Sequence, residues 1–169
     1  MAFLELAKKR CSVRAYEDRA VEQEKVDAIL EAARVAPSAA NRQPVRVIVV
    51  RGDEALSKLD RACNRHGAPL AFIVCADRGT AWTRPYDDMQ TIDIDASIAC
   101  DHMMLEAADQ GVGSVWICMF DPDVIREEFG LAENVVPVNI LAAGYSSSWK
   151  SPERHAEDRH PVEDFVTYA

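Results

Sequence analysis

Two arginines and a serine near the start of the chain have the spacing of a phosphate-binding segment. Arg10, Ser12 and Arg14 are two residues apart, so their side chains share one face if the segment is extended. Guanidinium groups form paired, charge-assisted hydrogen bonds with phosphate oxygens, and a hydroxyl adds a further donor. A solvated charged segment has the same composition, so the spacing alone leaves both interpretations open.

A second stretch, residues 37–44, combines small side chains with two amides. It contains Pro-Ser-Ala-Ala-Asn-Arg-Gln-Pro, and the proline at each end discourages helix continuation. Small residues let the backbone approach a flat ligand closely, while the amides of Asn41 and Gln43 can donate and accept hydrogen bonds. An ordinary loop between a helix and a strand is the alternative. We refer to residues 37–44 as the proline-flanked loop.

Together these stretches resemble the nitroreductase family of FMN-dependent oxidoreductases. Residues 10–16 are similar to the family pattern R-R-S-x-R-x-[FY], and residues 36–44 to A-P-S-x-x-N-x-Q-P. Further along, residues 93–96 open a helix, as the family's D-x-x-x-A does, and residues 111–117 are similar to G-L-G-x-x-W-I. Residues 144–145 are Gly-Tyr, and residues 159–166 resemble R-x-P-[LIV]-E-[ED]-x-[VI]. The resemblance therefore spans nearly the whole chain.

The resemblance implies an FMN cofactor bound at the interface of a homodimer. The implied cofactor-binding residues are Arg10, Cys11, Ser12, Arg14, Pro37, Ser38, Ala39, Ala40, Asn41, Gln43, Ile117, Cys118, Met119 and Arg159. The arginines and the serine would hold the phosphate, and Cys11 would contact FMN mainly through its backbone. The proline-flanked loop would come from the other subunit and lie along the edge of the isoalloxazine ring. A backbone N–H of Cys118 or Met119 would lie near flavin N5.

The implied reaction transfers a hydride from NAD(P)H via flavin N5 to a nitroaromatic, a quinone or a similar electron-poor acceptor, in ping-pong order. The cofactor carries the redox chemistry, so no catalytic side chain is predicted. A non-catalytic FMN-binding protein and a specialised flavin enzyme, such as a dehalogenase, are the alternatives, since the family's substrate face is built from variable loops, here residues 77–90. The sequence does not specify the physiological acceptor or a preference for NADH over NADPH.

Two positions depart from the family pattern. Relatives commonly carry a lysine two residues before the final arginine, where this chain has Glu157. An acid there weakens a phosphate site unless Lys150 or Arg154 takes the place of the lysine. His102 lies where family members often carry an amide, and a lone helical histidine is more often a satisfied buried imidazole than a catalyst.

Composition sets the broad class. The chain has 169 residues and a net charge of -9, which fits one domain and argues against nucleic acid or an anionic membrane surface as a partner. Five irregularly spaced cysteines form no C-x-x-C, and the Cys63–His66 spacing completes no zinc site, so no metal is predicted. Free thiols and the lack of a secretory pattern favour the cytoplasm.

The apolar pattern predicts the elements that position these residues. We expect helices over residues 3–9, 22–35, 54–62, 91–110 and 121–129, and strands over 45–50, 70–76, 115–119 and 135–143. Gly111 and Gly113 are expected to end the long helix, and Pro137 to lie at a strand edge or start. The helix over 91–110 is apolar nearly all round, which predicts burial in the core and at a subunit interface.

Alternation of helices and strands by itself favours a parallel α/β sheet. The resemblance implies instead an α+β three-layer fold, with a mostly antiparallel sheet between helices and an intertwined homodimer. On this interpretation residues 1–169 form a single FMN-binding domain, and residues 146–169 are a tail that packs on the partner subunit.

Overall fold

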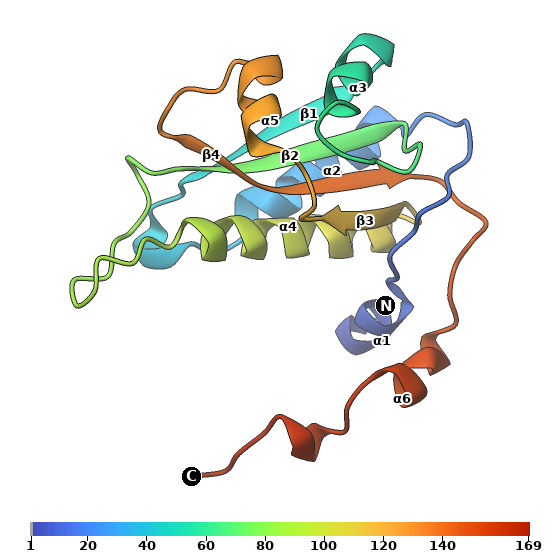
Figure 1. The fold of residues 1–169 in the computed structure, drawn as a ribbon. Helices are drawn as coiled ribbons and strands as arrows, with labels where there is room; N and C mark the ends of the chain where they lie inside the picture. The colour runs from blue at the N-terminus through green and yellow to red at the C-terminus, as the bar shows by residue number, and fades with distance from the viewer. Residues whose placement is uncertain (1) are drawn as a thin grey trace.

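A four-stranded antiparallel sheet forms the centre of the computed structural model, which describes residues 2–169 (Figure 1). The strands are β1 (Val45–Arg51), β2 (Leu70–Asp77), β3 (Gly113–Ile117) and β4 (Val135–Gly144). Their order is β1-β2-β4-β3, and every neighbouring pair is antiparallel. The α+β prediction is therefore confirmed. The parallel sheet favoured by alternation alone is wrong, because a helix between two strands does not fix the direction in which the second strand runs.

Helices cover both faces of the sheet and make three layers. The helices α2 (Gln23–Val35) and α4 (Ile92–Asp109) lie on one face, and α3 (Asp53–Leu59) and α5 (Pro122–Phe129) lie on the other (Figure 1). Along β2, Phe72 packs into the α2 and α4 core while Ile73 packs into the α3 and α5 core. Both faces of this strand are covered, which explains its continuous apolar run.

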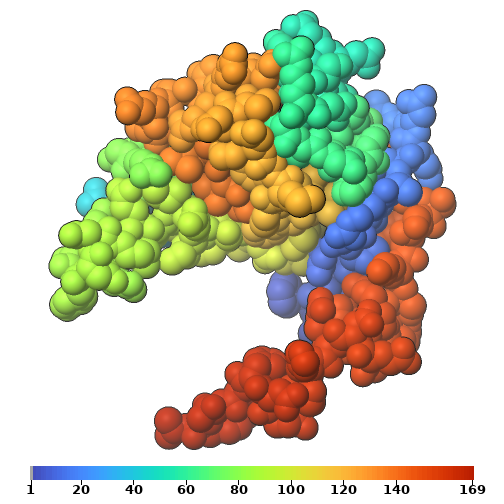
Figure 2. Space-filling view, in the orientation of Figure 1, coloured from blue at the N-terminus to red at the C-terminus, as the bar shows by residue number. Residues whose placement is uncertain are grey.

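The two ends of the chain lie side by side outside these layers. The short helices α1 (Phe3–Lys9) and α6 (His155–Asp158) are neighbours, and residues after 159 extend away from the body (Figures 1 and 2). Single turns of 3-10 helix occur over Ala39–Asn41, Pro152–Arg154 and Val162–Asp164. At the far side, residues 78–90 project as an arm (Figure 2).

Most predicted elements are present, with two informative differences at the ends of β3. The strand begins at Gly113, so only Gly111, with φ +72°, ends α4 in the left-handed conformation. Gly113 is required for another reason, since a Cβ there would lie 2.9 Å from Val13 Cγ2. The strand ends at Ile117 rather than at residue 119, because the following residues leave β4 and pair Phe120 with Cys63.

The long helix α4 is buried on one side only. Its inward residues pack in the core, whereas Ile94 is 47% exposed, and Ile98 and Leu105 on the same face are half-buried. Burial in the core is therefore confirmed for the inward side, and an apolar stripe faces outward, where burial at a subunit interface stays a prediction. Within residues 2–169 no helix combines the length and the apolar character needed to cross a bilayer.

Pro137 occupies the third position of the interior strand β4. It pairs with Cys75 of β2, directly beside a shift in the register between these strands. The ladder with β3 involves only the second half of β4, from Ile140 onward. The proline therefore lies where that strand is paired on one side, as a residue without a backbone N–H requires.

Candidate functional site

A cleft at the joined ends of the chain collects the predicted phosphate-binding side chains. Its volume is about 190 Å³. It is lined by Arg10, Cys11, Ser12, Arg14, Lys150, Arg154, His155, Asp158 and Arg159. Residues from two segments more than a hundred positions apart thus surround one space, which we call the terminal cleft.

The N-terminal segment reaches the cleft by crossing the start of β3. Ser12 forms a parallel bridge with Ser114, and the N–H of Val13 donates to the Ser114 carbonyl oxygen over 2.9 Å. The extended backbone turns Val13 and Cys11 inward, where both are buried, and leaves Ser12 and Arg14 on the cleft side. The alternation expected from an extended segment is therefore present.

Tyr16 fixes the far end of this segment. Its hydroxyl lies 2.9 Å from the Val13 carbonyl oxygen and 3.2 Å from the Ala142 carbonyl oxygen. The hydroxyl donates its proton, and the two carbonyl oxygens can share it. Burial raises the pKa of the phenol well above its usual value, and the charge of Arg14 has a smaller, opposite effect. Gly144 leaves room for the ring, because a Cβ there would lie 2.9 Å from Tyr16 Cδ1.

Arg154 joins the tail to the first helix. Its guanidinium donates to the carbonyl oxygens of Lys8, at 3.2 Å, and Arg10. The thiol of Cys11 accepts a long hydrogen bond, 3.5 Å, from the Lys150 N–H. The guanidinium of Arg154 is thus bonded to backbone carbonyl groups, and its role is to hold the two ends of the chain together.

The other arginines of the cleft have no carboxylate partner. Within residues 2–169, Arg10, Arg14 and Arg159 form no ion pair. Asp158 is the one carboxylate that lines the cleft, whereas Glu157 is exposed and lies outside the lining. The acid in the family's lysine position therefore does not enter the site, and unpaired positive charge dominates it.

The proline-flanked loop has a strained backbone. Ala40, Asn41 and Gln43 adopt φ values of 50°, 52° and 53°, a left-handed conformation that costs an L-residue roughly 1–2 kcal/mol. The Ala39 N–H donates to Asp95 Oδ1 over 2.9 Å, and the Gln43 N–H to Ser38 Oγ over 2.9 Å. These bonds fix the loop in a conformation that composition does not reveal.

Beside this loop lies a mainly apolar cavity of about 330 Å³. The walls come from α2, β1 and α4, and they include Pro37, Ser38 and Gln43 of the loop. Ala40 and Asn41 do not line the cavity and are exposed to solvent. The side chain of Asn41 is therefore free to contact a molecule outside this chain.

The proline-flanked loop and the N-terminal segment that lines the terminal cleft lie at opposite ends of α4 (Figure 1). The loop is bonded to Asp95 in the first turn, whereas the cleft adjoins Ser114, just after the helix ends at Asp109. At the usual rise per residue, Asp95 and Asp109 are about 21 Å apart. One chain therefore does not bring the two groups of predicted residues into a single pocket.

The last residue of β3 and the two residues after it differ in how far their side chains are exposed. Ile117 is buried in the α3 and α5 core, so its side chain cannot meet a ligand. Cys118 is exposed and Met119 is 88% exposed. The buried amide of Asn139 accepts from Trp116 Nε1 over 2.8 Å, and the Cys118 thiol lies 3.9 Å away. This network fixes the direction in which the chain leaves the sheet.

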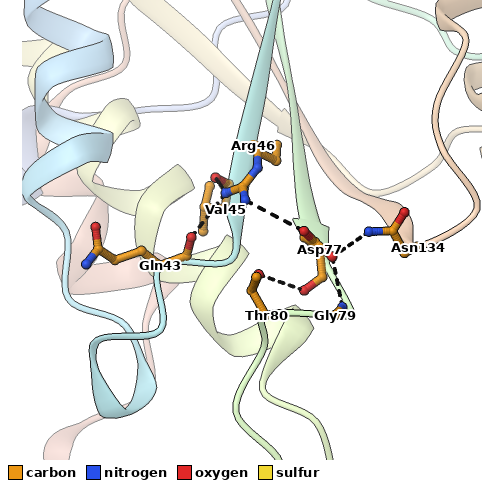
Figure 3. Close-up of polar contacts among 7 residues, drawn as sticks. All are labelled: Gln43, Val45, Arg46, Asp77, Gly79, Thr80 and Asn134. Carbon is orange, nitrogen blue, oxygen red and sulfur yellow. Dashed lines mark hydrogen bonds and ion pairs between the residues drawn. The ribbon is translucent and has the colours of Figure 1, made fainter.

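A second polar cluster connects the proline-flanked loop to the arm (Figure 3). Arg46 donates to the Gln43 carbonyl oxygen over 3.1 Å and lies 3.6 Å from the Asp77 carboxylate. Asp77 also accepts from Asn134 Nδ2 over 2.7 Å and from the Gly79 N–H over 2.8 Å. These donors, first of all the Asn134 amide, hold the pKa of Asp77 below its usual value.

The arm itself is ordered by its own bonds. Thr83 and Gln90 form an antiparallel bridge, and Arg84 pairs with Asp87. Its tip carries the exposed ring of Tyr86. The predicted long loop is therefore a short, irregular hairpin that adjoins the proline-flanked loop.

Other candidate groups have structural surroundings. His102 Nδ1 lies 2.9 Å from the Ile98 carbonyl oxygen of its own helix. All five cysteines are free, and burial raises the pKa of Cys63 and of Cys75 to about 11. Among the described residues no cluster of three or more His, Cys, Asp or Glu side chains is arranged to hold a metal ion.

Sequence reasoning left one positioning group unassigned. Asp95 holds the proline-flanked loop through the Ala39 N–H. The local sequence around an acidic residue in the first turn of a helix does not reveal a hydrogen bond to a residue 56 positions earlier. Lys150 and Arg154 were expected only as substitutes for the family's lysine, and both line the cleft.

Comparisons with known proteins agree with this architecture. The sequence profile described as the Nitroreductase family matches residues 7–67 and 63–145. The crystal structure of a nitroreductase family protein from Clostridium difficile 630 is 53% identical, with a TM-score of 0.97, over 99% of this chain and 98% of that one. An FMN-dependent nitroreductase from Clostridium difficile R20291 is 29% identical, with a TM-score of 0.78 over 98% of each chain. A Bacillus subtilis strain 168 protein named FMN reductase, NAD(P)H, is 30% identical over 176 residues, which are 92% of this chain and 71% of the relative.

Proposed function

This chain belongs to the Nitroreductase family, and on that premise we propose that it is an FMN-dependent NAD(P)H oxidoreductase. The acceptors would be nitroaromatics, quinones or similar electron-poor molecules, used in ping-pong order with NAD(P)H. The observation that carries the proposal is the terminal cleft, where several cationic side chains surround a serine hydroxyl in a protein of net charge -9. Relatives named FMN reductase and FMN-dependent nitroreductase support the choice of cofactor and of reaction.

The residues of the cleft fit the phosphate of FMN. Arg10, Arg14 and Arg159 supply guanidinium donors that no carboxylate neutralises within residues 2–169, and Ser12 adds a hydroxyl. Such pairs with phosphate are charge-assisted and hence stronger than neutral hydrogen bonds. Cys11 would contribute through its backbone, because its side chain is buried. A local positive site also overcomes the repulsion between an anionic ligand and the acidic protein.

When bound, FMN supplies hydride transfer between NAD(P)H and the acceptor. The chain contributes backbone and amide groups around it. We assign a backbone N–H of Cys118 or Met119, and the backbone of Ile117, to the region of flavin N5. Preorganised donors at such a position stabilise negative charge as it develops. We assign no side chain as a nucleophile or general acid.

We further propose that the site is completed by a second copy of the chain. The proline-flanked loop of one protomer would lie along the edge of the flavin that is held in the cleft of the other. Pro37, Ser38, Ala39 and Ala40 would form this edge. Asn41 and Gln43 would form hydrogen bonds with the polar groups of the flavin. The separation of loop and cleft along α4 within one chain supports this arrangement (Figure 1).

Exposed apolar surface also supports a homodimer. The outward stripe of α4 includes Ile94, which is 47% exposed. The tail extends from the body of the molecule (Figure 2), and its Phe165 is 72% exposed. Exposed apolar groups that gather on such segments are typical of interaction surfaces. We propose that residues 146–169 pack on the partner subunit. The five free cysteines favour a reducing compartment, so the cytoplasm is the proposed location.

The test is a visible absorption spectrum of purified protein, followed by NADH and NADPH oxidation with a nitroaromatic, a quinone or free FMN as acceptor. The proposal predicts flavin bands that either reduced nucleotide bleaches, and parallel lines in double-reciprocal plots. A flavin spectrum that neither nucleotide bleaches would favour the alternative, a non-catalytic FMN-binding protein. Bleaching without turnover of any of these acceptors would favour a specialised flavin enzyme such as a dehalogenase. Protein that binds no added FMN would contradict the proposal.

A further inference from the structure

The proline-flanked loop keeps a left-handed backbone that is held in part by side chains from outside the loop. Ala40, Asn41 and Gln43 are left-handed, and none of them is glycine. Such strain persists only where the surroundings fix the chain, and it gathers at functional sites. Ala40 carries only a methyl group, so the turn must be held through its neighbours. Two side chains from outside the loop, Asp95 and Arg46, hold these neighbours in place.

The first anchor is the carboxylate of Asp95. Its Oδ1 accepts the N–H of Ala39, the residue directly before the turn, over 2.9 Å, and its Oδ2 accepts the Thr91 hydroxyl over 2.8 Å. Asp95 is only 1% exposed, and it forms no ion pair with any of residues 2–169. Each carboxylate oxygen therefore has a donor, and one of the two donors belongs to the loop.

The second anchor acts after the turn. Gln43 donates its N–H to Ser38 Oγ, and its carbonyl oxygen accepts from Arg46 over 3.1 Å (Figure 3). The side chain of Arg46 is half exposed, whereas Asp95 is buried. The buried anchor is screened less by water, so we expect it to dominate.

We propose that Asp95 is a positioning residue, which holds the Ala39 amide and thereby keeps Asn41 and Gln43 turned outward, toward the flavin bound by a second copy. The inference rests on the proposed function, because the loop needs a flavin to meet. In this role Asp95 would not need to touch the cofactor. It acts through the backbone of the loop, and no motif of the sequence assigns it this role.

The test compares three variants of the full chain. Asp95→Ala removes both hydrogen bonds. Asp95→Asn keeps an oxygen for the Ala39 N–H, and the Thr91 hydroxyl can reverse to accept from the new amide. Asp93→Ala is the matched control, since Asp93 is an exposed aspartate in the same helical turn. It changes the charge equally without touching the loop.

Two measurements are made on each variant. The first is the rate of tryptic cleavage after Arg42, an exposed residue inside the loop, in protein without added FMN. It reports local opening of the loop and does not need the cofactor. The second is the dissociation constant of FMN, with KM and kcat for the acceptor measured on loaded protein.

We expect Asp95→Ala to raise both the cleavage rate and the FMN dissociation constant by about tenfold, the effect of losing a hydrogen bond to a charged group. The acceptor KM should rise more than kcat falls. Asp95→Asn should remain within about threefold of wild type and Asp93→Ala within about twofold, since neither loses the bond to the loop.

The results that overturn the inference differ from those that overturn the function. If wild-type protein binds FMN but Asp95→Ala matches Asp93→Ala in both measurements, the positioning role is wrong and the function stands. Equal losses in Asp95→Asn and Asp95→Ala also overturn it. If wild-type protein does not bind FMN, the function is wrong, and cleavage after Arg42 still tests the anchor.

A second variant covers the case in which Asp95→Ala does not fold. Ala39→Pro removes the same hydrogen bond from the side of the donor, and Ser38 already has the extended backbone that a residue before proline requires. The FMN dissociation constant should again rise about tenfold. An unchanged constant would overturn the inference.

Discussion

The terminal cleft and the proline-flanked loop present ligands with different kinds of group. The cleft is made of charged side chains from both ends of the chain, gathered around Ser12. The loop is made of backbone in a left-handed conformation, held by Asp95 and Arg46. Residue type determines the first kind of site, whereas contacts distant in sequence determine the second. The two should therefore respond differently to substitution.

The largest expected effect is on FMN affinity, which substitutions in the cleft should weaken more than substitutions in the loop. Arg10→Ala should raise the FMN dissociation constant about 10- to 100-fold, because it removes a charge-assisted contact with phosphate. Asn41→Ala should raise it only about 2- to 10-fold, since a neutral hydrogen bond contributes less. Fluorescence titration of FMN measures both. Arg42→Ala, in the loop but without an assigned contact, is the control. Full flavin occupancy in purified Arg10→Ala protein would refute the phosphate assignment.

A second prediction concerns the backbone segment that carries Arg14 into the cleft. Gly144→Ala places a Cβ 2.6 Å from Pro69 Cδ and 2.9 Å from Tyr16 Cδ1. Overpacking of this kind lowers the free energy of unfolding by about 1–3 kcal/mol. It should also weaken FMN binding, because Tyr16 holds the segment that carries Arg14. Thermal unfolding and FMN titration are the measurements.

Gly130→Ala is the control for that substitution. Gly130 has φ +62°, and a Cβ added there would meet no atom within 4 Å, so the change costs about 1 kcal/mol through backbone conformation alone. FMN affinity should stay at the wild-type value. If both variants lose FMN equally, the weakening reflects general instability and not the position of Tyr16.

The smallest expected effect concerns the base of the arm, next to the loop. The pKa of Asp77 is lowered first by the Asn134 amide, then by the Gly79 N–H, and last by Arg46. Because the pKa is depressed in the folded state, the stabilisation is complete above the unfolded value, about 3.9, and is lost as the pH falls through the folded value. Asn134→Ala should raise the pKa of Asp77 toward the unfolded value, so the stabilisation should be smaller and its loss should be complete at a higher pH.

An NMR titration of the Asp77 carboxyl carbon, in wild type and in Asn134→Ala, checks this order. The Arg46→Ala variant should shift the pKa less, since its charge is the weakest of the three influences. A larger shift in Arg46→Ala than in Asn134→Ala would contradict the assignment.

The same contrast explains what the sequence could and could not predict. Element types followed from apolar periodicity, and the continuous run of β2 correctly indicated a strand covered on both faces. The spacing of Arg10, Ser12 and Arg14 predicted that their side chains lie on one side of the segment, because successive side chains of an extended segment point to two opposite sides. All three line the terminal cleft. Strand direction did not follow from local pattern, and only the resemblance indicated an antiparallel sheet.

The loop shows where such prediction ends. Its composition indicated close approach to a ligand, but the left-handed Ala40 and the bond from Ala39 to Asp95 depend on a helix 56 positions away. The end of β3 at Ile117 likewise depends on the pairing of Phe120 with Cys63. Contacts of this kind are set by tertiary packing, for which a single sequence carries no local signal.

The central claim is that each flavin site combines the cleft of one protomer with the loop of the other. It is tested most directly in a mixed dimer, purified through two different tags, in which one chain carries Arg10→Ala and the other carries Asn41→Ala with Gln43→Ala. If loop and cleft come from different chains, one site of the pair has no substitution, and about half of the wild-type turnover returns. If the mixed dimer shows only the average of the turnovers of the two substituted homodimers, the site lies within one chain and the account is wrong.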